Sequence, residues 1–408
     1  MKSNYKKIGK YIQPVNIRNK ELEVDTLLGV SIKKILIPSI ANTVGTNMKT
    51  YKVIKRNQFA YGPVTSRNGD KVSIALLEEH DVAIVSQAYT VFEVIDETEL
   101  DPEYLMMWFR RPEFDRYARF KSHGSAREIF DWNELRETEL PIPSIEKQRE
   151  IVKEYNTVVN RIKLNEQLNQ KLEEAAQALY KHWFVDFEFP VTKESHPELV
   201  SGSPELEGKP YKSTGGAMVY NEELEKDIPV GWEIKGLGEV ATITAGGDKP
   251  KIFSENETLE CNIPIYSNST VKDGLFGFSN KSKVKDNSVT ISARGGIGFT
   301  SLRSKPYVPI VRLINVIPNE IKYLNYIFHF LSIYEYSDIA SAQAQLTKPD
   351  VESFKLIYAN KRVSTKFQVI TDKLYSRIVL NKDIIEKTLV LKNLLLSKMT
   401  KVEEKEIA

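Results

Sequence analysis

Residues 151–183, IVKEYNTVVNRIKLNEQLNQKLEEAAQALYKHW, form the stretch that decides the fold. Mostly apolar residues recur in it at alternating steps of four and three, which is the heptad seam of a coiled coil. The seam consists of Ile151, Tyr155, Val158, Ile162, Asn165, Asn169, Leu172, Ala176, Leu179 and Trp183. No glycine or proline interrupts residues 144–184, so the pattern predicts one continuous helix of about 60 Å at 1.5 Å per residue. A helix of that length acts as a spacer.

A second stretch near the C-terminus has the same spacing. Arg161-Ile162-Lys163-Leu164-Asn165 returns as Arg377-Ile378-Val379-Leu380-Asn381, 216 residues later. Shifted by this offset, the seam becomes Phe367, Thr371, Leu374, Ile378, Asn381, Ile385, Thr388, Lys392, Leu395 and Met399, reinforced by Ile370, Ile384, Leu391 and Leu396. We predict that the two helices pair as an antiparallel coiled coil, with Asn165 and Asn381 at the same seam position fixing the register. The alternative is two amphipathic helices packed separately on their own domains.

The same offset continues upstream of both helices, which indicates an internal duplication with a pseudo-twofold relation. Residues 104–109 resemble residues 323–328 after a shift of 219, and two further segments match at 216. These segments are Ser125–Phe130 with Ser341–Leu346, and Leu140–Ile142 with Leu356–Tyr358. The change in offset implies a deletion of three residues between the matches.

Each long helix follows a region of mixed strand and helix patterns, so the fold class is α+β with two mixed α/β domains. Strands are predicted at 71–77, 82–94, 239–244, 288–292 and 308–317, and helices at 102–111, from 112 to about 123, and after 318–319. A stretch rich in proline, glycine, serine and acidic residues joins the halves. The predicted organisation is domain 1–143, helix 144–187, connector 188–231, domain 232–359 and helix 360–402.

Charge is distributed unevenly along a chain whose net charge is only +2. Residues 1–72 hold 14 lysines and arginines against four acids, whereas residues 73–109 hold nine acids and no lysine or arginine. A second basic stretch, 272–312, holds eight basic residues against two acids. Local basic patches in a nearly neutral chain favour a groove for a polyanion, although solvated surface charge is the alternative.

Composition and motifs exclude several classes of protein. The 408 residues include one cysteine, Cys261, and no apolar stretch of transmembrane length, so we expect a cytoplasmic protein without disulfides or membrane spans. The five histidines lack metal-ligand spacing, and the Gly202–Lys209 stretch departs from a phosphate-binding loop. We therefore expect no catalytic residue, no metal and no cofactor on this chain.

A duplicated binding protein for duplex DNA fits these observations best. Base edges are read by donors and acceptors, which arginine, lysine, asparagine and glutamine supply. The candidate DNA-binding residues are Arg56, Arg67, Asn68, Gln87, Tyr89 and Arg127 in the first domain, and Asn268, Lys272, Arg294, Gln343 and Gln345 in the second. A free-standing coiled-coil DNA-binding regulator and a scaffold that binds no DNA are the alternatives.

Several motifs resemble the specificity subunit of type I restriction-modification enzymes over nearly the whole chain. They are Leu140-Pro141-Ile142-Pro143-Ser144-Ile145-Glu146-Lys147-Gln148, Asn165-Glu166-Gln167-Leu168, Trp183-Phe184-Val185-Asp186-Phe187, Lys209-Pro210-Tyr211-Lys212-Ser213-Thr214-Gly215-Gly216, and Ile228-Pro229-Val230-Gly231-Trp232. The second junction departs from this pattern, because Tyr358-Ala359-Asn360 replaces proline-rich sequence and Ser364 stands opposite Gln148.

The resemblance implies two target recognition domains that each read half of a bipartite DNA target, with spacer helices that set the unread gap. It implies docking of two adenine methyltransferase subunits, and of motor-nuclease (restriction) subunits in the restricting complex. S-adenosylmethionine, ATP and Mg²⁺ would then belong to those partners. For the spacer and docking role we select Ile151, Tyr155, Val158, Ile162, Asn165, Leu172, Leu179, Leu374, Ile378, Asn381, Ile385 and Leu395.

Overall fold

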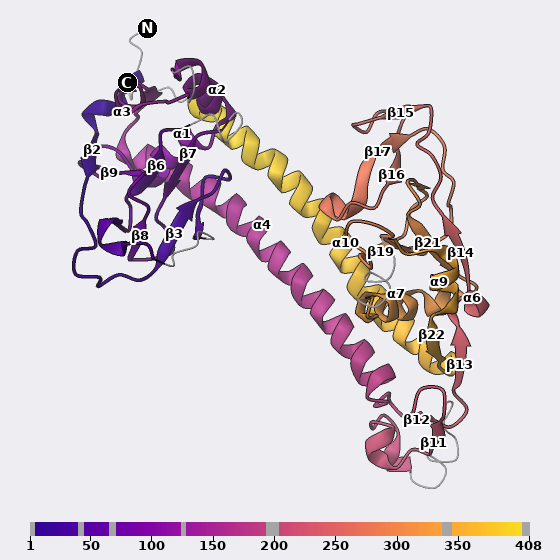
Figure 1. Cartoon of the computed structure of the whole chain (residues 1–408). Coiled ribbons are helices and arrows are strands. Elements are labelled where there is room, and N and C mark those ends of the chain that lie inside the picture. The colour runs from indigo at the N-terminus through magenta and orange to yellow at the C-terminus, as the bar shows by residue number, and fades with distance from the viewer. Residues whose placement is uncertain are drawn as a thin grey trace. The chain divides into compact units, whose positions relative to one another are not determined.

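The two longest elements of the computed structural model, which describes residues 5–39, 45–64, 71–123, 128–192, 204–336 and 345–401, are helices α4 and α10 (Figure 1). Helix α4 spans Ile145–Tyr180 and continues into a π-helical turn, η3 (Lys181–Val185). Helix α10 spans Lys361–Lys398 and precedes the 3-10 turn η8 (Met399–Lys401). Their first residues are 216 positions apart, which is the offset of the sequence repeat.

The chain forms two compact units, and each contains part of both helices. Unit 1 combines Met1–Glu166 with Lys382–Ala408, and unit 2 is the continuous stretch Gln167–Asn381. In unit 1, Leu396 of α10 and Met399 of η8 belong to the same hydrophobic core as Tyr155 of α4. The N-terminal core of this protein is therefore completed by the C-terminal helix.

Within unit 2 the two helix segments run antiparallel. The Asn381 side-chain amide donates a hydrogen bond of 2.9 Å to Asn169 Oδ1, and the rings of Trp183 and Phe367 lie 5.9 Å apart. Fourteen residues separate Asn169 from Trp183, and fourteen separate Phe367 from Asn381, so the partners move in opposite directions along the two helices. All predicted seam residues of both helices are buried or half-buried, apart from the reinforcing Leu391, which is exposed.

Unit 1 is built on two four-stranded sheets. The first is antiparallel with the order β2-β9-β6-β7, in chain order β2 (Ile12–Val15), β6 (Phe59–Gly62), β7 (Ser73–Leu76) and β9 (Thr90–Val94). The second has the order β4-β3-β8-β5, with β3 (Leu27–Val30), β4 (Leu36–Pro38), β5 (Lys52–Lys55) and β8 (Val82–Val85). Only its β3–β8 pair is parallel.

Short helices and a strand pair complete unit 1. Strand β1 (Tyr5–Lys7) pairs with β10 (Glu139–Pro141), and the helices are η1 (Ile8–Lys10), η2 (Met48–Thr50), α1 (Pro102–Phe109), α2 (Pro112–Lys121) and α3 (Trp132–Arg136). Asp101 caps α1 by accepting a hydrogen bond from Tyr104 N, and Pro102 occupies the first turn, as the sequence predicts. The predicted strand 82–94 is two strands, β8 and β9.

Unit 2 repeats the first sheet of unit 1 strand for strand. Its antiparallel order is β14-β21-β18-β19, in chain order β14 (Ala241–Ala245), β18 (Ser288–Ile291), β19 (Thr300–Arg303) and β21 (Ile314–Pro318). The second sheet differs in order, β15-β17-β16-β20, with β15 (Phe253–Ser254), β16 (Ile263–Tyr266), β17 (Leu275–Ser279) and β20 (Val308–Pro309). Here β16 and β20 are the parallel pair.

The remaining elements of unit 2 surround this framework. They are η4 (Pro204–Leu206), η5 (Lys212–Thr214), the hairpin β11 (Met218–Asn221) with β12 (Lys226–Pro229), β13 (Glu233–Gly236) paired with β22 (Lys355–Tyr358), α6 (Leu237–Val240), η6 (Val271–Gly274), η7 (Ile321–Tyr323), α7 (Leu324–Ile333) and α9 (Lys348–Ser353). Residues 239–240 of the strand predicted at 239–244 belong to α6, because Glu239 accepts a hydrogen bond from Gly236 N and favours a helical turn.

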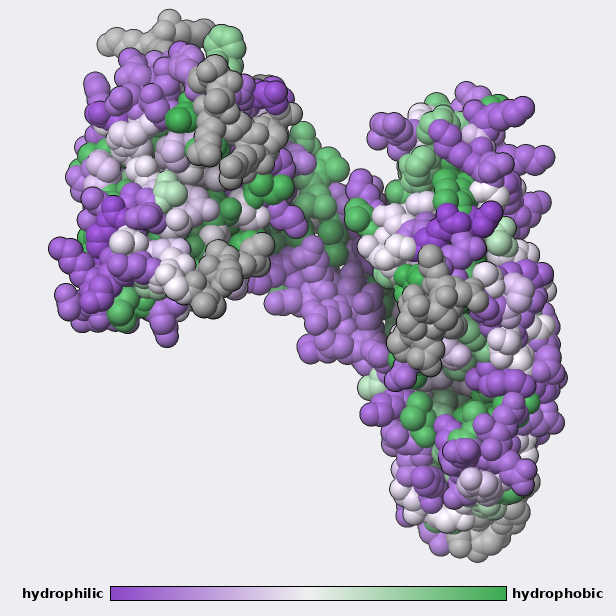
Figure 2. Space-filling model, viewed as in Figure 1, coloured by the Kyte–Doolittle hydropathy of each residue, from purple (hydrophilic) through white to green (hydrophobic). Residues whose placement is uncertain are grey.

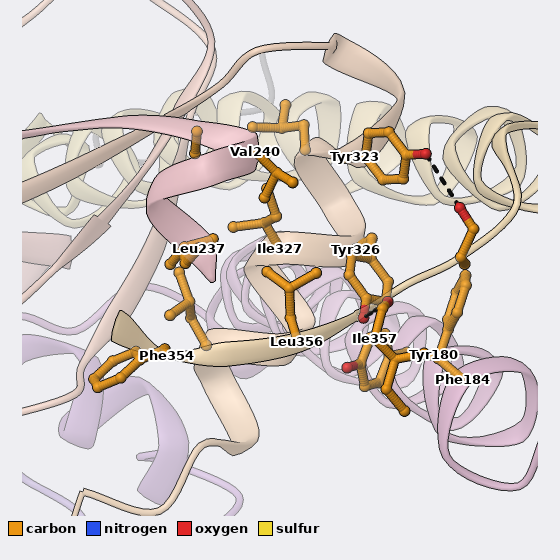
Figure 3. Close-up of a cluster of buried hydrophobic side chains, with 14 of the residues drawn as sticks. Tyr180, Phe184, Leu237, Val240, Tyr323, Tyr326, Ile327, Phe354, Leu356 and Ile357 are labelled. Carbon is orange, nitrogen blue, oxygen red and sulfur yellow. Dashed lines mark hydrogen bonds between the residues drawn. The ribbon is translucent and has the colours of Figure 1, made fainter. Parts of the chain in front are cut away.

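Figure 3 shows the core of unit 2, in which Tyr180 of α4 and Phe184 of η3 meet Tyr326 of α7. Tyr326 packs edge-to-face on Phe184, with ring centroids 4.7 Å apart, and its hydroxyl donates to the Ile357 carbonyl at 2.6 Å. Phe189, in the predicted connector, and Trp232, at the start of the predicted second domain, are buried in the same core. The connector is therefore partly a packed element, since aromatic side chains stabilise it more than its proline and glycine content suggests.

A buried glutamine of each long helix binds the start of a shorter helix, α1 in unit 1 and α7 in unit 2. In unit 1, Gln148 is fully buried, accepts from Asp101 N at 2.9 Å and donates to the Glu99 carbonyl. In unit 2, Gln368 accepts from Asn325 N at 2.9 Å. Ser364 occupies the position that matches Gln148 in the sequence repeat, and Gln368 lies one helical turn beyond it. Gln368 therefore makes the contact that a glutamine at position 364 was expected to make. The predicted fold class, two mixed α/β units with long helices, is confirmed.

Candidate nucleic-acid interface

Three loops of unit 2 converge where the central strand β18 ends. The backbone N–H of Ala293 donates to Asn268 Oδ1 at 2.7 Å, and the carbonyl of Ala293 accepts from Leu346 N at 2.9 Å. These contacts bring together residues 267–274, 292–298 and 345–346, which are distant in the sequence. Three predicted site residues, Asn268, Arg294 and Gln345, therefore lie in one place.

Asn268 links a fourth loop to this cluster. Its side-chain N–H donates to the Val311 carbonyl at 2.6 Å, and its backbone carbonyl accepts from Ser292 Oγ at 3.1 Å. Val311 and Arg312 adopt left-handed backbone conformations, with φ of 53° and 62°. Because both ends of the Asn268 amide have partners within the fold, we interpret this residue as a support for the loops.

Below these loops a buried arginine supports the turn around Lys272. Lys272 and Asp273 have φ of 50° and 53°, and Arg303 Nη2 donates to the Asp273 carbonyl at 2.6 Å. The Arg303 guanidinium lies 3.6 Å from the centre of the Tyr266 ring, and its Nε donates to Thr290 Oγ1. Burial lowers the pKa of Arg303 from its ordinary value because it penalises the charged form. The turn is thus held from beneath, and Lys272 stays exposed.

Exposed cations surround the loop cluster. They are Lys249, Lys272, Lys283, Arg294 and Arg312. Within the described part of the chain none of the five forms an ion pair with an acidic side chain. Arginine and lysine in this state are the groups that contact nucleic-acid phosphates. The predicted basic stretch 272–312 therefore contributes most of one surface patch.

Arg294 differs from the other cations because its guanidinium is hydrogen-bonded to a neighbouring side chain. Its Nε donates to Gln345 Oε1 at 2.8 Å, and its Nη2 donates to the same oxygen. The backbone turns directly after it, at Gly295, where φ is 73°. Gln343, also a candidate, lies outside the described residues.

Unit 1 presents the equivalent edge at the end of β6. There Phe130 N donates to the Pro63 carbonyl at 2.9 Å, as Leu346 N does to Ala293, and Val64 forms an isolated bridge with Ile129. Tyr89 packs against Gly62 at this edge, since a Cβ on that glycine would meet its ring at 3.2 Å. Gln87 is exposed two residues earlier. Arg67, Asn68 and Arg127 lie outside the described residues.

Arg56 lies at the opposite end of the β5–β8 strand pair from Gln87 and Tyr89. In the antiparallel pair of β5 and β8, Lys52 is opposite Val85 and Lys55 is opposite Val82, so the residues that follow each strand lie at opposite ends. Arg56 forms an ion pair of 2.9 Å with Asp81 there. The structure therefore does not bring Arg56 together with the other candidates of this unit.

The residues that we selected for docking lie in the seam and are buried or half-buried. Exposed apolar side chains lie elsewhere on the same helices, and Figure 2 shows hydrophobic residues gathered along the C-terminal part of α10. They are Leu164 and Leu168 on α4, and Val369, Val379, Leu380, Leu389, Val390, Leu391 and Leu394 on α10. Apart from Leu391, which we had placed beside the seam, sequence reasoning missed this set because it treated only seam positions as informative.

Among the residues that the structure describes, no cluster of three or more histidine, cysteine or acidic side chains could hold a metal ion. No helix in the same ranges has both the length and the apolar character to span a membrane. Cys261 is buried and free.

Comparison with known proteins places these features in a family. A family model described as the type I restriction modification DNA specificity domain matches residues 26–174 and 229–388. The HindI specificity subunit of Haemophilus influenzae is 24% identical over 86% of this chain and 88% of its own length. The MjaIX specificity subunit of Methanocaldococcus jannaschii is 31% identical over 38% of this chain, a match that spans only about a third (32%) of that relative. A crystal structure of a type I specificity subunit from M. genitalium has a TM-score of 0.59 at 15% identity, covering 98% of this chain and 96% of that chain.

Proposed function

Because the chain belongs to the type I restriction modification DNA specificity domain family, we propose that it is the DNA-reading subunit of a type I restriction-modification complex. Each unit would read one half of a bipartite duplex target in the cytoplasm. The observation that carries the proposal is the duplication of one sheet order, β2-β9-β6-β7 and β14-β21-β18-β19, with loops gathered at the end of the same central strand. Two copies of one reader on one chain favour a target with two half-sites.

The loop edge of unit 2 supports contact with duplex DNA. Its exposed cations Lys249, Lys272, Lys283 and Arg312 lack acidic partners within the described ranges, so phosphates can approach them without displacing an ion pair. The loops that carry them are held by Asn268 and Arg303. A rigid edge of this kind positions side chains for reading bases.

The exposed apolar residues of α10 support docking of other subunits. Leu389, Val390 and Leu394 are 39%, 58% and 52% exposed and follow one another within two turns of the helix. A contiguous apolar patch on a helix marks a protein interface. We assign it to methyltransferase subunits, two of which would bind the helices, and motor-nuclease subunits would join through them.

The proposal assigns no reaction to this chain. S-adenosylmethionine, ATP and Mg²⁺ would bind to the methyltransferase and motor-nuclease subunits. Purified chain supplied with these cofactors is therefore expected to leave duplex DNA unmethylated and uncut.

The experiment that tests the function is co-expression of the chain with its methyltransferase, followed by purification and mapping of adenine methylation in the host genome. We expect a stable complex and one bipartite methylated sequence that disappears when this chain is omitted. A double variant, Val390→Glu with Leu394→Glu, should lose the methyltransferase during purification, whereas Lys387→Glu, an exposed change on the same helix, should retain it. Methylation that persists without this chain, or a chain that binds duplex with no methyltransferase partner, would contradict the proposal.

A further inference from the structure

The Arg294–Gln345 pair has the geometry of a preassembled base reader. We propose that Arg294, held by Gln345, reads a guanine in the half-site recognised by unit 2. This inference rests on the proposed function and deepens it, because it assigns a residue pair and a base to one half of the target.

The hydrogen bonds of the pair leave the correct edge of the guanidinium open. An arginine side chain has five N–H donors and no acceptor, so the Gln345 atom that contacts it must be the carbonyl oxygen. This oxygen takes one hydrogen from Nε and one from Nη2. The remaining three donors are both hydrogens of Nη1 and one of Nη2, and one N–H from each of these two nitrogens forms the end-on pair. Guanine presents two adjacent acceptors, O6 and N7, in the major groove, and end-on arginine matches them.

The backbone beneath Arg294 is fixed on both sides. The preceding residue, Ala293, has its N–H bound by Asn268 and its carbonyl bound by Leu346 N, at 2.7 and 2.9 Å. On the other side of Arg294, Gly296 lies so close to Thr270 that a Cβ on this glycine would approach the threonine methyl group at 2.7 Å. Arg294 is itself exposed. The side chain thus projects from a rigid turn in one orientation, which reduces the entropy lost on binding a base.

The neighbouring cations have the properties expected of residues that contact phosphates. Lys272, Lys283 and Arg312 are exposed and have no acidic partner among the described residues, so each can adjust to a phosphate at several positions. Phosphate contacts tolerate such freedom because they carry no sequence information, whereas a base contact requires fixed direction. Gln345 is neutral and leaves the charge of Arg294 intact while it fixes the plane of the guanidinium. Arg294 is therefore the cation of this patch that is built for reading.

Unit 1 offers an internal comparison. The residues at the equivalent positions, next to the matching Pro63 and Phe130 contact, are Val64 and Ile129, and they bridge each other. Neither side chain can donate a hydrogen bond. The duplicated scaffold therefore carries a polar reader in unit 2 and an apolar pair in unit 1 at the same place, which is the pattern expected of a position that determines specificity.

The test is selection of bound duplexes from a random-sequence library by the full chain in complex with its methyltransferase subunits. The wild-type complex should select a bipartite sequence in which at least one position is guanine. Arg294→Ala should lower the preference for guanine at one position by about five- to a hundredfold and leave the preferences at the other positions unchanged. Arg294→Lys keeps the charge but lacks the paired N–H donors of the guanidinium, so it should also lower the guanine preference at that position. It serves as the second variant if Arg294→Ala reduces solubility.

Two changes at Gln345 separate reading from a merely structural role. Gln345→Leu removes the acceptor and should weaken the guanine preference at the same position, whereas Gln345→Glu keeps an acceptor oxygen and should retain it. Lys272→Ala is the control for a phosphate contact. It should weaken binding to all sequences alike, and it should lower the slope of log affinity against log salt concentration by about one.

The possible outcomes distinguish this inference from the proposed function. If the wild-type complex selects no sequence at all, both fail. If it selects a bipartite sequence but Arg294→Ala behaves like Lys272→Ala, or relaxes a position that is not guanine, the function stands and the assignment of Arg294 is wrong.

Discussion

Unit 1 and unit 2 share one four-stranded sheet and differ at its edge and at its anchor to the helix. At the edge, Val64 and Ile129 in unit 1 correspond to Arg294 and Gln345 in unit 2. At the anchor, the buried glutamine is at the first turn of α4 but one turn later in α10. The sheet and the helices are therefore the part that the two units share, while the loops that would meet a ligand differ.

The largest expected effect comes from lengthening the helices that both units share. A heptad inserted in α4 between Asn165 and Leu172 preserves the seam and adds about 10 Å at 1.5 Å per residue. Because each unit contains parts of both helices, a matching heptad is needed in α10 between Ile378 and Ile385. The paired insertion should add about three base pairs to the unread gap of the methylated sequence, at about 3.4 Å per base pair, or fewer if the helices are tilted to the duplex.

The single insertions are the controls for this change. A heptad in α4 alone shifts one helix segment against its partner and should reduce the yield of folded complex, and an insertion of four residues should do so more strongly because it rotates the seam. If the paired insertion gives an active complex whose half-sites keep their original spacing, the helices do not set the gap.

A pH-dependent difference between the units is expected to be the next largest. His329 of α7 is buried, its Nε2 lies 2.9 Å from Tyr375 Oη, and burial lowers its pKa to about 4. The unfolded chain binds this proton near pH 6.5, so the stability that neutral His329 supports is present above about pH 6.5 and is lost as pH falls towards 4. The loss should reach about 3 kcal/mol and fall on unit 2. The sequence repeat places Arg110, which cannot titrate in this range, at the matching position of unit 1.

Thermal unfolding of wild type and His329→Leu between pH 7.5 and 4.5 measures this difference. The variant is expected to be less stable at pH 7.5 but to lose less stability on acidification. Equal slopes for the two proteins would show that His329 is not the group responsible.

The smallest expected effect concerns the two glutamine anchors. Gln148→Ala removes the partner of the half-buried Asp101 N–H and of the buried Pro143 carbonyl. Gln368→Ala removes the partner of the buried Asn325 N–H. Each change should cost about 1–3 kcal/mol of stability, and Gln177→Ala at an exposed position of α4 should cost almost nothing. Hydrogen exchange should show faster opening of α1 in the first variant and of α7 in the second. Opening of the same helix in both would break the correspondence between the anchors.

The helices were the most predictable part of this fold. The heptad spacing depends on residues within the same helix, so the seam from Ile151 to Trp183 follows from local pattern alone. The offset of 216 residues then predicted the duplicated architecture, since matching sequence implies matching elements. Leu391 was misassigned to the seam because an apolar residue one helical position away from the stripe looks the same in the sequence, yet it is 47% exposed.

The candidate site was less predictable because it depends on contacts between distant strands. Arg56 and Gln87 are both polar residues after strands, and only the register of β5 with β8 shows that they lie at opposite ends. Asn268 has the chemistry of a base reader, but its amide is used to join loops. The pairing of Arg294 with Gln345 joins residues 51 positions apart and has no signal in local sequence.

The discontinuity of unit 1 has a consequence for how the protein is made. Unit 2 is continuous and can fold once residue 381 has left the ribosome, whereas unit 1 requires Leu396 and Met399 to complete its core. Domains usually fold from the N-terminus as synthesis proceeds. In this chain we expect the reverse order, because the core of the N-terminal unit is incomplete until residues 396–399 have been made, and a nascent chain truncated before residue 396 should expose that incomplete core.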